Sequence, residues 1–150
     1  MKFDRKQFVE DVRNLVTQGV VFRHQGSDPA TGMDCINTPR WGYERQGLTL
    51  PAEISAEFAT YGRHPDGEHF LATMRRWFIE LEFTETEPGD LFVLYARRNP
   101  QHMAIKVTND DPPRIVEAYC SVTDLIGKLI EWPLDPRRRI AACFRIPDFD

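Results

Sequence analysis

One cysteine and the loop before it carry the clearest chemical signal in this sequence. Residues 22–35 read FRHQGSDPATGMDC, a stretch rich in glycine and turn-forming residues that ends at Cys35. An apolar-periodic segment starts directly afterwards, so we expect Cys35 in the first turn of a helix, with Asp34 as the N-cap. The positive end of a helix dipole favours the thiolate, which is the nucleophilic form of cysteine. The alternative is a buried structural cysteine, because free cysteine is among the most buried residue types.

A nucleophilic cysteine needs a general base and usually a third group that orients this base. Of the four histidines, His102 is the best candidate, because it opens a predicted strand just after a turn and is therefore held on a rigid element. His24 lies in the loop before Cys35, where it can contact substrate or brace the loop. His64 and His69 are expected to be surface residues.

Glu117 is the candidate for the third group. It lies on the next predicted strand, on the same face as Ile115 and Tyr119, and its sequence neighbours are apolar. A buried carboxylate without a partner is costly, and a hydrogen bond from an imidazole N–H would give it one. The alternative is a glutamate on an edge strand that faces water.

Composition narrows the class of protein. A chain of 150 residues is expected to form one domain, residues 1–150, with a sizeable core. A net charge of −4 argues against a nucleic-acid partner, and the basic run 137–139 is predicted to be a solvated turn, with anion binding as the alternative. The three cysteines are widely spaced and form no disulfide framework or zinc motif, so we expect neither a metal nor another cofactor.

The first residues are charged and lead into an amphipathic segment, unlike the apolar core of a signal peptide. No run approaches the roughly 20 apolar residues that cross a bilayer, so we expect no membrane insertion. The expectation is a protein that is made in the cytoplasm without an export signal and that needs another route to any target outside it.

Hydrophobic periodicity predicts helices first and strands afterwards. We expect helices over residues 4–18, 35–46, about 52–61 and 68–81. Strands are expected over residues 91–95, 102–107, 114–119, 129–132 and 140–146. This order is typical of an α+β domain with an antiparallel sheet.

Four segments in this order resemble the NlpC/P60 superfamily of papain-like cysteine peptidases, and within it the short members associated with phage tails. The segments are RHQGSDPATGMDC, PGDLFVLY, PQHMAIKV and RIVEAY, and the resemblance covers nearly the whole chain. It implies a papain-like α+β fold in which N-terminal helices pack on an antiparallel sheet of about five strands. It also implies Cys35 as nucleophile, His102 as base and Glu117 at the orienting position, where many members have histidine.

The resemblance further implies an activity and partners. Family enzymes cut the peptide stems of bacterial peptidoglycan, typically between D-Glu and the diamino acid. The implied partners are therefore a peptidoglycan stem peptide and, for the phage-tail type, tail or secretion-apparatus proteins. Action on the cell wall would follow delivery or lysis.

Three positions depart from the family pattern. Phe22 stands where members often have a tyrosine that lines the oxyanion site, so oxyanion stabilisation would depend on the Cys35 backbone N–H and on His24. Ile36 and Asn37 replace a serine and a small residue, which leaves Asp34 to contact the substrate amine. These departures keep two alternatives open: an inactive structural or binding component of a phage-tail-like assembly, and a thiol acyltransferase or other amidase on the same layout.

Overall fold

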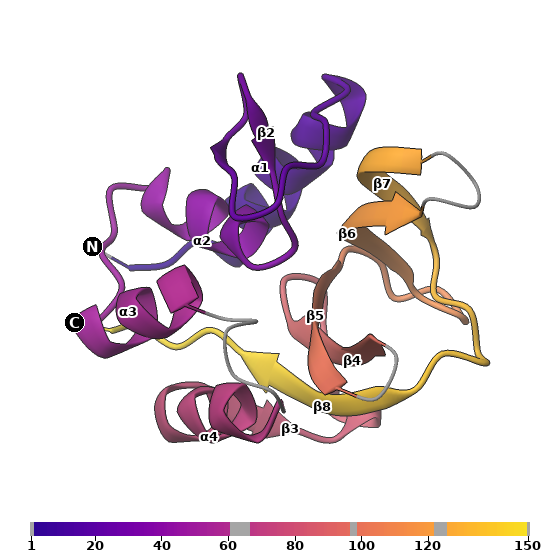
Figure 1. The fold of residues 1–150 in the computed structure, drawn as a ribbon. Helices are drawn as coiled ribbons and strands as arrows, with labels where there is room; N and C mark the ends of the chain where they lie inside the picture. The colour runs from indigo at the N-terminus through magenta and orange to yellow at the C-terminus, as the bar shows by residue number, and fades with distance from the viewer. Residues whose placement is uncertain (1, 61–66, 97–98, 122–125, 150) are drawn as a thin grey trace.

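The computed structural model describes residues 2–60, 67–96, 99–121 and 126–149. Its helical part lies first in the chain and its main sheet second, which confirms the predicted α+β class (Figure 1). The helices are α1 (Arg5–Thr17), α2 (Asn37–Glu44), α3 (Ala52–Thr60), α4 (Glu68–Trp77) and the short 3-10 helix η1 (Phe83–Glu85).

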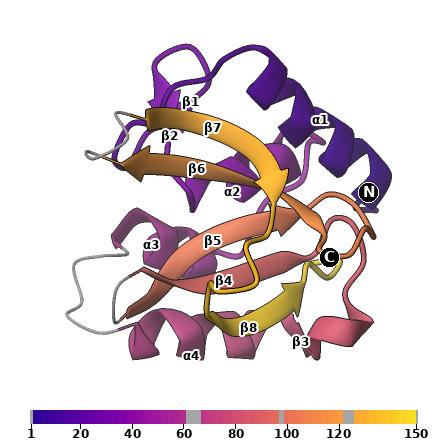
Figure 2. The same ribbon diagram turned by 90° about the vertical axis from the view of Figure 1, so that its right-hand side faces the viewer.

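The main sheet has six antiparallel strands in the order β3-β8-β4-β5-β6-β7. They are β3 (Ile79–Leu81), β4 (Leu91–Ala96), β5 (Asn99–Lys106), β6 (Arg114–Ser121), β7 (Ile126–Pro133) and β8 (Ile140–Arg145). Helices α1–α4 lie on one side of the sheet, and the N- and C-terminal ends of the chain lie near each other (Figures 1 and 2). The Phe83 ring of η1 instead stacks on Phe92, whose side chain lies on the opposite face. A hydrogen bond of 2.8 Å from the Phe3 N–H to Asp148 Oδ1 joins these two ends.

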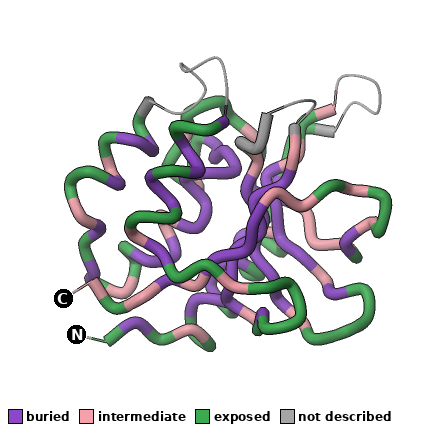
Figure 3. The backbone as a smooth tube through the Cα atoms, turned by 90° about the horizontal axis from the view of Figure 1, so that it is seen from below, coloured by how far each residue is buried: buried purple, intermediate pink, exposed green. Residues whose placement is uncertain are grey.

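Alternating side chains of the strands form two apolar layers. Odd-numbered positions such as Met103 and Ile105 of β5 belong to the large cluster that also contains the helix residues. The even-numbered Ala104 belongs to a smaller cluster on the opposite face, together with Phe92 and Ile115. Buried stretches of the backbone therefore gather where the helices meet the sheet (Figure 3).

The end of the helix predicted over residues 68–81 is wrong. Helix α4 ends at Trp77, and residues 79–81, predicted to continue it, form the edge strand β3. The chain becomes extended at Phe78, and Ile79 pairs with Arg145 of β8. The free edge of β8 offers these residues hydrogen-bond partners that a longer helix would leave unused, so tertiary pairing outweighs local helix propensity.

The pairing of β5 with β6 is short, and this positions the candidate residues His102 and Glu117. Among the residues that the structure describes, the ladder pairs Ile105 with Val116 and Lys106 with Ile115. His102 and Glu117 lie beyond the paired part, on the same face of the two strands by alternation. Their side chains can therefore meet without a ladder between the two backbones at this point.

Helix α2 packs closely against α1 at Gly42. A Cβ atom there would lie 2.7 Å from two ring carbons of Phe8, which is fully buried. This close packing holds α2, and with it the segment that carries Cys35, against the core.

We predict that Gly42→Val lowers the free energy of unfolding by about 1–3 kcal/mol, because the added methyl groups force the Phe8 ring out of its position. Gly127→Val is the matched control, since a Cβ at Gly127 meets nothing within 4 Å. Chemical denaturation of both variants measures the difference. Equal stability of the two would show that the α1–α2 contact is not tightly packed.

Candidate active site

Cys35 lies between a small hairpin and helix α2. The hairpin consists of β1 (Ser27–Asp28) and β2 (Gly32–Met33), which the sequence did not predict. Backbone hydrogen bonds from Met33 N to Val21 O and from Asp34 N to Gly26 O, at 3.0 and 3.1 Å, fix the chain just before the cysteine. Cys35 is buried, with 8% of its surface exposed.

Asp34 caps the turn that carries Cys35. Its Oδ1 accepts from the N–H groups of Ile36 and Asn37 at 3.2 and 2.8 Å, and its Oδ2 accepts from Gln25 N at 2.9 Å. The Thr38 N–H donates to the Asp34 carbonyl at 3.2 Å, which closes a helical turn over Cys35. Asp34 therefore accepts backbone N–H groups as predicted, but it is not the N-cap of the regular helix: α2 starts at Asn37, two residues later than expected, with Ile36 as its N-cap. Contact of Asp34 with a substrate amine remains a prediction.

The His102 imidazole joins Cys35 to Glu117. His102 Nε2 lies 2.5 Å from Glu117 Oε1. The same ring is hydrogen-bonded to the Cys35 side chain. Because Nε2 is committed to the carboxylate, Nδ1 is the nitrogen that remains for the sulfur. The three side chains come from the turn before α2, from β5 and from β6.

The electrostatics of this contact favour a protonated ring. Burial disfavours the imidazolium and is the largest single influence, yet charge interaction and hydrogen bonding with Cys35, together with Glu117, raise the pKa of His102 to about 10. A protonated imidazole beside a cysteine stabilises the thiolate form of the sulfur. The arrangement therefore suits a thiolate–imidazolium pair.

Glu117 is fully enclosed and has three donors. Its side chain accepts from His102, from Trp132 Nε1 at 2.6 Å, and from Arg138, with Nη1 at 2.5 Å and Nη2 at 2.9 Å. Burial opposes ionisation, but the hydrogen bonds from His102 and Arg138 lower the pKa of Glu117 to about 2. Since β6 lies between β5 and β7, the alternative of an edge-strand glutamate facing water is wrong.

Sequence reasoning missed Trp132 and Arg138 as partners of Glu117. The run 137–139 lies at a turn, as predicted, but its three side chains have different partners. Arg137 pairs with Asp135, Arg138 turns inward to Glu117, and the Arg139 guanidinium lies 4.4 Å from the centre of the Tyr95 ring. The only signal in the sequence was the anion-binding alternative for this run, and it named no target.

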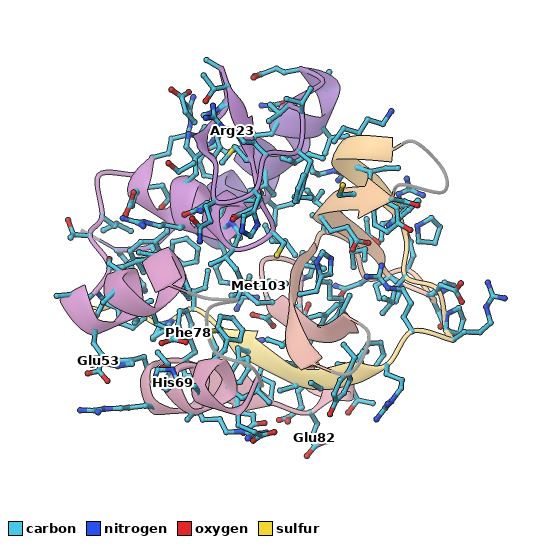
Figure 4. All side chains as sticks on the ribbon, in the orientation of Figure 1. Arg23, Glu53, His69, Phe78, Glu82 and Met103 are labelled. Atoms are coloured by element: carbon cyan, nitrogen blue, oxygen red, sulfur yellow. The ribbon has the colours of Figure 1, made fainter. Side chains whose placement is uncertain are left out.

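The other predicted side chains lie in different surroundings. Phe22 is half-buried and packs against the large apolar cluster, and its phenyl ring offers no hydrogen-bond donor. His24 is exposed in the segment that leads to Cys35, and its role toward substrate stays a prediction. His69 is exposed on α4, at the periphery of the molecule, and pairs with Glu57 at 2.8 Å (Figure 4). His64 lies outside the described residues.

The remaining cysteines differ from Cys35 in their surroundings. Cys143 is buried, and burial together with the nearby Asp90 charge raises the pKa of its thiol to about 11, so it is unreactive near neutral pH. Cys120 is exposed on β6. Within the described ranges, no cluster of three or more His, Cys, Asp or Glu side chains is arranged to hold a metal ion. In the same ranges no helix combines the length and the apolar character that crossing a bilayer requires.

The raised pKa of His102 predicts how stability depends on pH. The unfolded chain releases the imidazolium proton of His102 at about pH 6.5, whereas the folded protein keeps it up to about pH 10. The stability that protonated His102 contributes to the fold is therefore complete below the pKa of the unfolded chain and is lost as pH rises through the pKa of the folded protein. We expect His102→Gln to lose more stability relative to the native chain at about pH 6 than at about pH 10, measured by chemical denaturation. A difference that is constant with pH would contradict this.

No protein-family model and no curated protein matches this sequence. Solved structures do match its fold. A Staphylococcus aureus subsp. aureus Mu50 protein described as similar to lipoprotein, NLP/P60 family, is 20% identical with a TM-score of 0.59. The P60 domain of a Mycobacterium avium subspecies paratuberculosis antigen is 21% identical with a TM-score of 0.57, and NlpC2 of Trichomonas vaginalis is 18% identical with a TM-score of 0.55.

The matches cover nearly all of this chain but different shares of the three solved chains. They extend over 98%, 97% and 93% of this chain, respectively. Of the matched chains they cover 98% for the isolated P60 domain but only 43% and 47% for the other two, so this chain spans less than half of those longer proteins. At these identities the likeness concerns the fold. The chain has the papain-like α+β fold of NlpC/P60 proteins, as the resemblance of its motifs predicts.

Proposed function

We propose that the chain is a cysteine peptidase that hydrolyses the peptide stems of bacterial peptidoglycan, at the bond between D-Glu and the diamino acid. The observation that carries this proposal is the His102 ring, which is hydrogen-bonded to Cys35 on one side and to Glu117 on the other. The NlpC/P60 fold supports the choice of substrate class, since the family resemblance implies cell-wall peptides.

The acylation step follows from the contacts of His102. The Cys35 thiolate attacks the carbonyl carbon of the scissile amide and forms the carbon–sulfur bond of a tetrahedral intermediate. The imidazolium of His102 then gives its proton to the leaving nitrogen, the carbon–nitrogen bond breaks, and the amine departs. A thioester on Cys35 and a neutral imidazole remain.

Deacylation reverses the direction of proton transfer. Neutral His102 takes a proton from water as the water oxygen attacks the thioester carbonyl, and the carbon–sulfur bond breaks. The carboxylic acid product leaves, and the thiolate–imidazolium pair is restored. Glu117 keeps the ring in one orientation through both steps, as a carboxylate does in Ser-His-Asp enzymes.

The oxyanion of the tetrahedral intermediate needs donors near Cys35. We assign this role to the Cys35 backbone N–H, at the start of the turn that Asp34 caps, with His24 as a second donor. Phe22 has no donor to add, and one missing donor typically costs on the order of 10²–10³ in rate. We therefore expect a slow enzyme.

A second candidate is a non-catalytic component of a phage-tail-like or secretion assembly. Phe22 at the expected donor position and the buried Asn37 favour it. For the enzyme, the same assemblies or cell lysis would supply access to the cell wall. The two candidates differ in whether a stem peptide is turned over.

We predict that the native chain cleaves L-Ala-γ-D-Glu-diamino acid peptides and that Cys35→Ala loses at least about 10⁴-fold of this activity, because it removes the nucleophile. Cys120→Ser is the matched control and should keep full activity, since Cys120 is an exposed residue with no part in the mechanism. Chromatography of the released diamino acid measures turnover. Equal turnover by Cys35→Ala would exclude the mechanism, and no turnover by the native chain on any D-Glu linkage would favour the second candidate.

A further inference from the structure

Glu117 is a charged residue at a position where many NlpC/P60 members have histidine. A buried carboxylate next to an imidazolium is stabilised by the opposite charge and raises the pKa of the ring. The structure contains a counter-charge that moderates this attraction, the guanidinium of Arg138.

The contact between Arg138 and Glu117 is a two-point contact. Nη1 donates to Oε2 and Nη2 donates to Oε1, so each nitrogen binds a different carboxylate oxygen. Oε1 is therefore shared between Arg138 and His102, and Oε2 between Arg138 and Trp132. A two-point contact of this kind fixes the plane of the carboxylate as well as its place.

The chain holds Arg138 in this position by its own local contacts. The Arg138 N–H donates to the Asp135 carbonyl at 3.0 Å, which closes a turn. Leu134, at the start of this loop, is buried in the smaller apolar cluster, and its N–H donates to the Pro113 carbonyl at 2.9 Å. The guanidinium therefore extends from an anchored loop.

Arg138 and Trp132 also separate Glu117 from solvent. Both line a surface cavity of about 600 Å³ together with Tyr119. The Tyr119 and Trp132 rings meet edge-on, with their centroids 4.9 Å apart. The Glu117 side chain behind them is 0% exposed, whereas 26% of the Arg138 side chain is exposed. The two residues keep water from the bond between Glu117 and His102.

We propose that Arg138 is a positioning residue: it neutralises and orients Glu117, so that the Glu117–Arg138 pair presents His102 with a fixed acceptor of low net charge. The pair thereby does the work of an uncharged third group. The inference rests on the proposed function for its catalytic meaning. Among the described residues, the titratable and charged groups that act on His102 are the Cys35 side chain from the turn before α2 and Glu117 from β6, with Arg138 behind Glu117.

The test is an NMR titration of the His102 ring in labelled protein, compared between Arg138→Met, Glu117→Gln and the double variant. Arg138→Met leaves the carboxylate charge uncompensated, so the pKa of His102 should rise above that of the native chain. Glu117→Gln leaves the guanidinium uncompensated, so this pKa should fall by about 1–3 units. The double variant, with neither charge, should titrate between the two single variants.

Arg138→Lys separates charge from geometry. It keeps the positive charge, so the pKa of His102 should be close to that of the native chain. The rate at which iodoacetamide alkylates Cys35 should be lower than in the native chain, because the two-point contact is lost. Alkylation is measured in a Cys120→Ser background, since Cys120 is exposed. Thermal unfolding of each variant identifies any that fail to fold.

An unchanged His102 titration in folded Arg138→Met, or shifts of the same sign in Arg138→Met and Glu117→Gln, would overturn the proposal and leave Arg138 a structural residue. These readouts need no peptide substrate. A failure of the native chain to cleave peptides would therefore count against the proposed function alone.

Discussion

The hydrogen bond between His102 and Glu117 is the interaction on which the site depends. A carboxylate with no exposed surface is destabilising unless its charge is compensated and its oxygens accept hydrogen bonds. Trp132 and Arg138 meet this requirement together with His102. The same contacts that make the buried charge tolerable also hold the imidazole in one orientation, so the stability of this region and its chemistry have the same physical origin.

The fold brings this network to Cys35 from separate parts of the chain. The helical half supplies Cys35 on a turn that Asp34 caps, and the sheet supplies His102 and Glu117 where the β5–β6 ladder has already ended. The tight contact of α2 with α1 at Gly42 fixes one side of this junction. A cysteine and a base that approach from two packed layers can be held at hydrogen-bond distance without a flexible loop between them.

The parts of the site that the sequence predicted are those with local or alternating signals. The cap at Asp34 follows from one residue type at a helix start, and the shared face of strand residues follows from a period of two. The arginine partner of Glu117 had no such signal, because it lies 21 residues further along and only the tertiary fold brings it back. Strand β3 was missed for the same reason, since its residues pair with residues 143–145 of β8, far along the chain.

The most direct test of the central claim is capture of the covalent intermediate. The native chain is mixed with a stem peptide that contains the D-Glu–diamino acid bond, the reaction is quenched with acid within its first turnovers, and the intact protein and its peptides are weighed by mass spectrometry. The account predicts an adduct on Cys35 with the mass of the acyl half of the peptide, present in the native chain and absent from Cys35→Ala and His102→Ala. Product release without any adduct on Cys35, or an adduct on another residue, would contradict it.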